Sequence, residues 1–198
     1  MVNDLNFRRS FPKEKKITAK EFFAFTENRP ENERYELIDG RIYLMAAPAI
    51  NHQRILRDIS NALINYLKGK PCEPFFAPVD VVLFEKDKNS DNSQNVFQPD
   101  IFVVCDPKKI GDKRIHGAPD LVIEVVSPSS ETHDYLRKFK IYMKYGVREY
   151  WIVNPEKKEI TVYFNTEEEE DYKTYAFSDK IKAGIFEDFY MDFNELQI

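Results

Sequence analysis

The chain has 198 residues, of which 42% are hydrophobic and 14% aromatic, and its formal net charge is −5 at pH 7. This composition suits one packed core and is marginal for two, so we expect a flexible N-terminal arm over residues 1–17 and a single domain over residues 18–198. An acidic chain lacks the overall basic charge typical of nucleic-acid-binding proteins, which argues mildly against DNA binding unless a local basic groove or bound cations supply the attraction.

Cysteine content and hydropathy restrict the class of protein further. Cys72 and Cys105 are too few for a disulfide framework or a zinc cluster, and Cys105 ends the apolar run 101–104, where a small buried thiol fits. No apolar stretch approaches the ~18 residues needed to cross a bilayer, and residues 1–16 are polar. We therefore expect a soluble cytoplasmic protein with no membrane association.

The N-terminal third predicts a helix, a hairpin and a second helix. Thr18 and Glu21 have the spacing of a capping box, which predicts a short helix to about Asn28. Asp39-Gly40 suits a tight turn between strands at residues 35–38 and 41–45. Apolar residues at helical spacing then predict a core-facing helix from residue 51 to about residue 69.

The rest of the chain predicts mostly strands. The apolar segments 79–84 and 97–104 predict paired strands, and residues 121–126 a strand buried on both faces. A helix over residues 131–145, a strand over 148–153 and a hairpin of 160–164 with 172–177 follow. From residue 51 the order is helix, three strands, helix, strand, which predicts an α/β (α+β) fold: a mixed sheet flanked by helices, with extra N-terminal and C-terminal hairpins.

Glu124 is the residue that points most clearly to a function, because it lies inside the apolar run 121–126. A lone ionised carboxylate in such a strand must neutralise, find a cationic partner or bind a metal. Asp100 precedes the neighbouring predicted strand, and two carboxylates on adjacent strands form a site for Mg²⁺ or Mn²⁺. Such a site activates water and polarises a phosphodiester. The alternative is structural: Asp100 caps a strand end and Glu124 pairs with a lysine.

Lys138 is the candidate third member of the site. On the predicted helix it could reach back over the Glu124 strand and orient the attacking water or stabilise charge on the phosphorus oxygens. The alternative, an ordinary surface pair with Asp134 worth about 0.3 to 0.5 kcal/mol, is equally compatible with the spacing.

The chain resembles the Uma-two family of restriction endonucleases over about residues 18–196. The motifs that agree in order are Tyr35 to Gly40, Gln98-Pro99-Asp100, Pro119 to Ser129, Asp134, Lys138, Tyr142 and Gly146 to Trp151. The resemblance implies the core of the PD-(D/E)XK nuclease superfamily, with Asp100 as the motif aspartate and Glu124 as the acidic residue of the E-x-K element. The lysine expected two residues after Glu124 is Val126, and the resemblance moves it to Lys138.

Several further residues are candidates for accessory roles. Glu36 is an additional acidic group by resemblance and by its place in the hairpin, or else an exposed strand residue. His52 could transfer a proton or contact a phosphate, or merely pack in a first helical turn. Asp120 could bind a second metal or have a structural role at the end of a strand. The basic loop of Lys108, Lys109, Lys113 and Arg114 could contact phosphates.

We therefore expect a Mg²⁺- or Mn²⁺-dependent endonuclease acting on DNA, with Asp100 and Glu124 as metal ligands and Lys138 and Glu36 completing the catalytic group. A homodimer would suit the cutting of two strands. One rival is a non-catalytic nucleic-acid or protein-binding module on a nuclease scaffold, favoured by the displaced lysine and the acidic charge. Another is a metal phosphohydrolase acting on a smaller phosphate ester.

Overall fold

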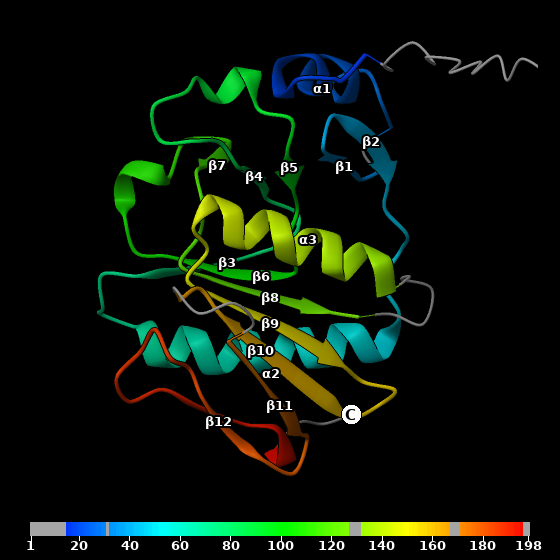
Figure 1. The fold of residues 1–198 in the computed structure, drawn as a ribbon. Coiled ribbons are helices and arrows are strands. Elements are labelled where there is room, and N and C mark those ends of the chain that lie inside the picture. Colours follow the sequence, from blue (N-terminus) through cyan, green and yellow to red (C-terminus); the bar gives the residue numbers. More distant parts are fainter. Residues whose placement is uncertain (1–14, 31, 127–131, 167–170, 196–198) are drawn as a thin grey trace, which may run out of the picture.

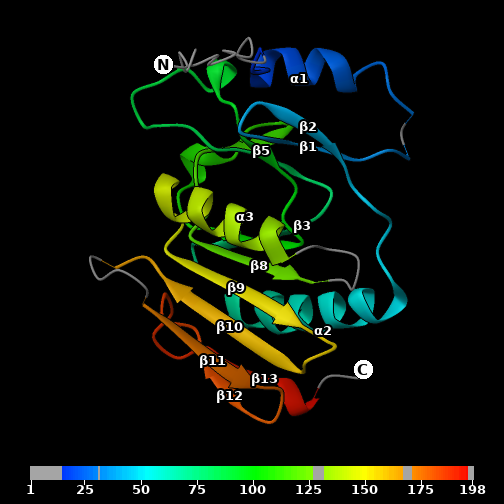
Figure 2. The ribbon, with the colours of Figure 1, turned by 45° about the vertical axis from the view of Figure 1, so that its right-hand side comes forward.

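A six-stranded sheet forms the central layer of the computed structural model (Figures 1 and 2). The structure describes residues 15–30, 32–126, 132–166 and 171–195, without the side chains of residues 132–134. In sheet order its strands are β11 (Tyr172–Ala176), β10 (Glu159–Phe164), β9 (Glu149–Asn154), β8 (Leu121–Val125), β6 (Ile101–Val104) and β3 (Glu73–Phe76). Only β8 and β9 are parallel neighbours. Helices α2 (Ile50–Leu67) and α3 (Thr132–Tyr145) cover opposite faces.

Alternation along β8 decides what each face of the sheet buries. Leu121, Ile123 and Val125 belong to the core that contains the apolar stripe of α2. Val122 belongs to the other core, with Tyr142 of α3. Since successive side chains point to opposite faces, Glu124 shares the α3 face with Val122. The strand is buried along its whole length, as its apolar composition predicts.

A second, five-stranded sheet packs beside the first. Its order is β2 (Arg41–Leu44), β1 (Tyr35–Ile38), β5 (Val96–Phe97), β4 (Asp80–Val82) and β7 (Arg114–His116). Helix α1 (Ala19–Thr26) covers it, and the predicted capping box of Thr18 and Glu21 is present. The predicted hairpin turn is confirmed as well, because Asp39 and Gly40 have φ angles of 49° and 77°.

The predicted strand pairing was wrong in one respect. The run 97–104 is divided between the two sheets: Phe97 ends β5, which pairs with β4, whereas β6 begins at Ile101 and pairs with β3 and β8. Gln98-Pro99-Asp100 lies between them, and proline cannot donate to a ladder. Strand β3 therefore holds the place in the central sheet that we assigned to residues 79–84. It contains Pro74, which an edge strand tolerates and which hides the strand in the sequence.

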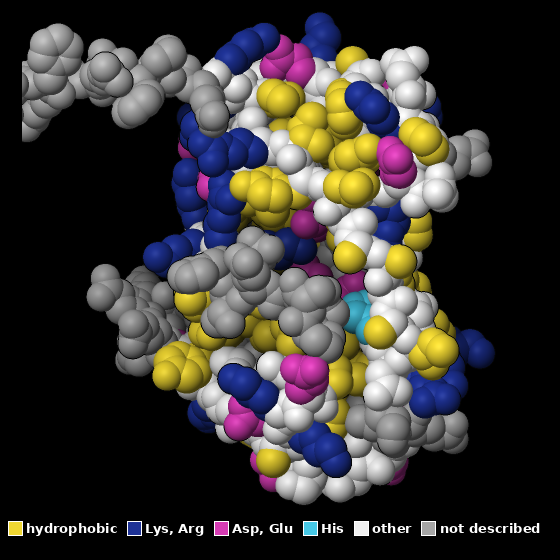
Figure 3. All heavy atoms as spheres, turned by 90° about the vertical axis from the view of Figure 1, so that its right-hand side faces the viewer, with side chains coloured by type: hydrophobic (Ala, Val, Ile, Leu, Met, Phe, Trp, Pro, Cys, Tyr) yellow, Lys and Arg dark blue, Asp and Glu magenta, His cyan; other side chains and the backbone are white. Residues whose placement is uncertain are grey.

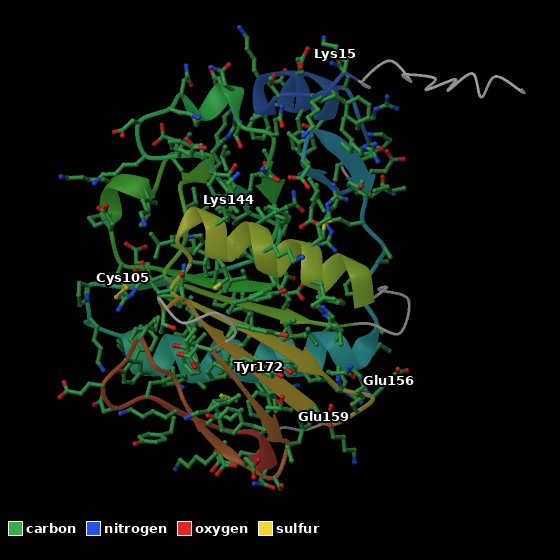
Figure 4. All side chains as sticks on the ribbon, viewed as in Figure 1. Lys15, Cys105, Lys144, Glu156, Glu159 and Tyr172 are labelled. Atoms are coloured by element: carbon green, nitrogen blue, oxygen red, sulfur yellow. A yellow bond between two sulfur atoms is a disulfide. The ribbon has the colours of Figure 1, made fainter. Side chains whose placement is uncertain are left out.

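The expectation of a free thiol at Cys105 was also wrong. Cys72 and Cys105 form a disulfide, with Cα atoms 4.0 Å apart. The register of β3 on β6 pairs Glu73 with Val104, so the two cysteines lie opposite each other one residue beyond the ladder. This pairing depends on the register of a strand that the sequence did not reveal. Figure 4 labels Cys105 at the edge of the molecule.

The C-terminal segment adds a small sheet and closes the core below α2. Strands β12 (Lys180–Lys182) and β13 (Tyr190–Asp192) pair with each other, and neither was predicted. Glu149, fully buried, accepts hydrogen bonds from Trp151 Nε1 at 2.7 Å and Ile185 N at 2.9 Å. It thereby ties β9 to the segment before β13. Trp151 and Tyr150 are core residues, as their apolar strand predicts.

The connections carry three short 3₁₀ turns, η1 (Ser90–Asn92), η2 (Pro107–Lys109) and η3 (Phe193–Glu195). The second lies in the predicted basic loop. Most of the predicted arm, residues 1–14, lies outside the described residues, and so do residues 167–170 between the two strands of the predicted C-terminal hairpin. Among the helices that the structure describes, none is both long and apolar enough to cross a membrane.

Candidate active site

The pairing of β6 with β8 brings two acidic residues to the same place. Ile101 lies opposite Ile123, so Asp100, directly before β6, lies beside Glu124. Asp100 Oδ2 accepts a hydrogen bond from the backbone N–H of Val125 at 2.9 Å. The predicted adjacency of the two carboxylates is therefore present, and the β8 backbone helps to orient one of them.

Lys138 reaches this pair from α3. Its Nζ lies 3.2 Å from Glu124 Oε1 and 3.0 Å from Glu36 on β1, and its side chain is only 11% exposed. Tyr142, one helical turn further, donates its hydroxyl to Glu124 Oε1 at 3.1 Å. Lys138 is thus a buried cation held by two carboxylates from separate sheets. The alternative partner that we considered, the Asp134 side chain, lies outside the described residues.

Glu36 connects the second sheet to the site. It is 4% exposed, so the alternative of an exposed strand residue is wrong. Besides its ion pair with Lys138, it accepts a hydrogen bond from the backbone N–H of Gln98 at 3.0 Å. The Gln98 side chain in turn donates to Asp80 Oδ1 at 3.0 Å. The loop that ends in Asp100 is therefore anchored to the strand that carries Glu36.

His52 lies in the first turn of α2 and faces the same carboxylates. Its Nε2 is 3.0 Å from Asp100 Oδ2, and the residue is 8% exposed. Burial lowers the pKa of the imidazole, but the hydrogen bond to Asp100 and the charges of Asp100 and Glu124 outweigh burial, so the net pKa is raised. Its Nδ1 is buried without a hydrogen-bond partner among the residues described here. His52 is thus positioned to hold Asp100 in one orientation.

Burial, and an excess of carboxylates over nearby cations, determine the pKa values of the ionisable groups in this site. Burial, together with the charges of Asp100 and Glu36, raises the pKa of Glu124 from its ordinary 4.5 to about 7, although Lys138 opposes this rise. Burial lowers the pKa of Lys138, but Glu124 and Glu36 more than offset it, so the pKa is raised and the ammonium stays charged. The site therefore favours an additional positive charge.

These residues face a pocket of about 270 Å³. Figure 3 shows it as a hollow with acidic side chains at its bottom and a histidine at its side. Besides Glu36, His52, Asp100, Glu124 and Lys138, its walls include Arg34, Tyr43, Tyr135 and the apolar segment 44–48. Leu44 is 64% exposed and Ile50 is 74% exposed, so the mouth has an apolar rim. The sequence signal for this rim was the uncharged stretch 44–50, which we did not interpret.

Asp120 and the basic loop are not brought to the pocket. Asp120 precedes the opposite end of β8, where it accepts a hydrogen bond from Cys105 N at 2.8 Å and pairs with Arg148 at 3.3 Å. The basic loop spans η2 and β7, which lie on the left of Figure 1, whereas β2 and the N-terminal ends of α2 and α3 lie on the right. Of its side chains, Lys109 donates to Ala118 O and Arg114 stacks on Phe23.

Comparison with known proteins agrees with the motif order. A family model described as "Uma2: Putative restriction endonuclease" matches residues 19–191. Uncharacterized protein slr1290 of Synechocystis sp. (strain ATCC 27184 / PCC 6803 / Kazusa) is 30% identical over 154 residues, which cover 77% of this chain and 76% of that protein. Uncharacterized protein sll1609 of the same organism is 27% identical over 128 residues, or 64% and 67% of the two chains.

A solved structure shares the fold. The crystal structure of "a putative nuclease belonging to DUF820" from Anabaena variabilis ATCC 29413 superposes with a TM-score of 0.72 and covers 90% of this chain and 96% of that chain. Its sequence identity is 18%, so this likeness concerns the fold alone. The predicted restriction-endonuclease-like fold is confirmed, and the chain belongs to the Uma2 family of restriction-endonuclease-like proteins.

Proposed function

We propose that this protein is a divalent-metal-dependent endonuclease that hydrolyses phosphodiester bonds of DNA. The observation that carries the proposal is the meeting of Asp100, Glu124 and Lys138 in one pocket, from a strand start, a strand and a helix. Membership of the Uma2 family and the restriction-endonuclease-like fold support a nuclease. Two acidic residues with a lysine are the residue types that phosphodiester hydrolysis needs.

The pocket fits a hard divalent cation such as Mg²⁺ or Mn²⁺. Asp100 Oδ1 and Glu124 Oε2 have no hydrogen-bond partner within the described part of the chain, so each residue has an oxygen available. Mg²⁺ typically takes one or two carboxylates and completes its shell with water and phosphate oxygens. No group of three or more His, Cys, Asp or Glu side chains suited to a metal occurs among the described residues. An ion held by this pair alone would keep positions open.

The charge of the pocket supports the same conclusion. Three carboxylates, Glu36, Asp100 and Glu124, face two permanent cations, Lys138 and Arg34. Burial is the main cause of the raised pKa of Glu124, and the charges of Asp100 and Glu36 add to it. A bound divalent ion would polarise the scissile phosphate and lower the pKa of a bound water. It would also make the pocket attractive to a phosphate that the carboxylates alone would repel.

The remaining residues have distinct roles in this proposal. Lys138 supplies a fixed ammonium beside Glu124, where it stabilises negative charge that develops on the phosphate oxygens or orients the attacking water. Glu36 holds Lys138 from the opposite side. His52 and the Val125 amide hold Asp100. Tyr142 holds Glu124. Each carboxylate is thus oriented by neighbours, as effective sites require.

The experiment that tests the proposal is cleavage of supercoiled and single-stranded DNA with Mg²⁺, Mn²⁺ or EDTA, comparing the wild type with Glu124→Ala and Lys138→Ala. We expect cleavage that requires the metal and is lost in both variants. Cleavage that survives in Glu124→Ala would overturn the assignment. A small aryl phosphate ester, tested in parallel, separates this function from a phosphohydrolase: faster turnover of the ester than of DNA would favour the latter.

A non-catalytic binding module is a second candidate, and one contact favours it. Lys138 and Tyr142 satisfy Glu124 Oε1 without any metal, so the buried carboxylate has a structural explanation. The two candidates differ in their response to Mn²⁺. Calorimetric titration should detect binding by the wild type that Asp100→Asn weakens at least tenfold. A protein that binds DNA but neither Mn²⁺ nor Mg²⁺ would be the binding module.

Two further parts of the proposal concern the protein in solution. We propose a homodimer, supported by the exposed Leu44 and Ile50 beside the pocket and by the place of β2 at the edge of its sheet among the described strands. Light scattering after size exclusion should give twice the monomer mass, and a monomer mass at 50 µM would refute it. We also propose a cytoplasmic location. Disulfides such as Cys72–Cys105 are uncommon in the cytoplasm, so the bond counts against this location. Fractionation of cells tests it directly.

A further inference from the structure

The solvent-facing side of α3 is basic. Arg137, Lys140 and Lys144 recur at spacings of three and four residues, which places them in one row along the helix. Lys140 and Lys144 are exposed, whereas Lys138 and Tyr142, on the other side, are buried. Figure 4 labels Lys144 at the end of α3 away from the pocket. The helix thus directs one lysine into the site and three cations outward.

The row of cations continues onto the β1–β2 turn. Arg137 donates to Tyr43 OH at 2.7 Å and to Ile38 O at 3.3 Å, and it pairs with Asp39 at 3.1 Å. Ile38 pairs in register with Arg41, which therefore lies close to Arg137.

Lys16 extends the row over the same turn. A Cβ placed on Gly40 would lie 2.7 Å from the Cβ of Lys16, and Ile17 N donates to Gly40 O at 2.9 Å. Lys16 and Arg41 are exposed. We call this row the basic strip; it consists of Lys16, Arg41, Arg137, Lys140 and Lys144.

The basic strip passes the mouth of the pocket at Arg137. Tyr43 and Ile38, both contacted by Arg137, are part of the pocket wall, and Lys138 is the next residue along α3. Figure 3 shows Lys and Arg side chains gathered along one side of the hollow. The strip consists of five cations, of which Arg137 pairs with Asp39, in a chain whose net charge is −5. Positive charge is therefore concentrated where a substrate would enter.

We propose that the basic strip binds the phosphate backbone of the nucleic acid and leads one strand to the pocket. The acidic pocket by itself repels a polyanion, so affinity must come from cations outside it. From Arg137 to Lys144 the helix rises by about 10 Å, which corresponds to about three nucleotide steps along one strand. The inference rests on the proposed function for the class of partner. It replaces the basic loop as the main contact, because that loop lies on the left of Figure 1, away from the pocket mouth on the right.

The experiment measures DNA binding in EDTA, so that it does not depend on turnover. Fluorescence anisotropy of a labelled 20-base-pair duplex, recorded from 50 to 200 mM KCl, gives the slope of log K against log salt. Lys140→Gln/Lys144→Gln is compared with Lys108→Gln/Lys113→Gln, which removes the same charge from the basic loop. All four lysines are exposed, so neither double variant disturbs the core. Thermal melting checks that both variants fold.

We expect the slope to become shallower by about 1.8 in the strip variant and to stay unchanged in the loop variant. A shallower slope of log K against log salt in the loop variant alone would overturn the inference. Equal slopes in the wild type, the strip variant and the loop variant would overturn it too. Anionic vesicles of phosphatidylserine and phosphatidylcholine are a second probe: binding to vesicles but not to DNA, lost in the strip variant, would assign the strip to a membrane surface instead. Absence of cleavage with intact strip-dependent DNA binding would overturn the proposed function and leave this inference standing.

Discussion

Replacement of Lys138 by methionine should destabilise the protein strongly, and more at high pH than at low pH. Lys138 Nζ lies between Glu36 at 3.0 Å and Glu124 at 3.2 Å, with all three side chains at most 11% exposed. Removing one partner of a buried ion pair typically costs about 3–5 kcal/mol, because the other charge is left uncompensated. Methionine has a similar length and no charge, so the change isolates the electrostatic effect.

The loss of stability in Lys138→Met depends on pH, because the carboxylates that lose the lysine can be neutralised by taking up protons. A carboxylate with an ordinary pKa of 4.5 can be neutralised for about 1.4 kcal/mol per pH unit above that value. At pH 8 this limit is about 5 kcal/mol for a carboxylate whose pKa in the wild type is ordinary, but only about 1.4 kcal/mol for Glu124, whose pKa is already about 7; at pH 5 it is below about 1 kcal/mol. The variant gives Glu124 a still higher folded-state pKa, so its stability is retained below pH 4.5 and lost as the pH rises.

Urea unfolding at pH 5 and pH 8 measures this effect. We expect Lys138→Met to lower the free energy of unfolding by about 3–5 kcal/mol at pH 8 and by less than about 2 kcal/mol at pH 5. Lys140→Met, an exposed position on the same helix, should change it by no more than about 0.5 kcal/mol. Adding Glu124→Gln to Lys138→Met should recover part of the loss. An equal loss at both pH values, or a loss below about 1 kcal/mol at pH 8, would refute the reasoning.

Three other predictions concern separate features. Burial raises the pKa of Glu124 from 4.5 to about 7, so its ionised form destabilises the fold and the wild type should lose about 3 kcal/mol of stability between pH 4.5 and 7. Glu124→Gln should remove this loss. Parallel curves of stability against pH for the two proteins would contradict this. Cys72→Ser/Cys105→Ser should lose about 3–4 kcal/mol under non-reducing conditions, because the disulfide closes a separation of 33 residues, whereas titratable thiols in the unreduced, unfolded wild type would exclude the bond. His52→Ala should weaken Mn²⁺ binding about 10-fold or more in calorimetry, with partial rescue by His52→Gln, because His52 orients Asp100; unchanged affinity would leave His52 a packing residue.

The sequence was informative where local rules determine structure. The capping box at Thr18, the turn at Asp39-Gly40 and the periodicity of α2 depend on neighbours close in the chain, and each predicted element is present. Glu124 could be singled out because a charge in an apolar strand needs a partner. Lys138 was a candidate because the following helix could return over that strand, but the spacing fitted a surface pair with Asp134 equally well, and the family resemblance favoured Lys138, which contacts Glu124.

The features that sequence reasoning missed depend on which strands pair over long distances. The division of residues 97–104 between two sheets, the edge strand β3 with Pro74, and the disulfide that follows from its register have no local signal. For Asp120 the sequence left open a second metal site and a role at a strand end, and the structure places it before β8, bonded to Cys105 N and Arg148. The basic strip joins residues from the start of the chain and from α3, so no window of sequence displays it.

Metal-dependent cleavage should depend on the carboxylates at one end of β8. Two aspartates allow a matched test: Asp100 lies in the pocket beside Glu124, whereas Asp120 lies beyond the opposite end of the same strand. The measurement is the rate at which supercoiled DNA is cut in Mg²⁺ by Asp100→Asn and by Asp120→Asn, each relative to the wild type. We expect cutting to be abolished in Asp100→Asn and to stay within about threefold of wild type in Asp120→Asn. Equal rates in the two variants, or a loss confined to Asp120→Asn, would contradict it.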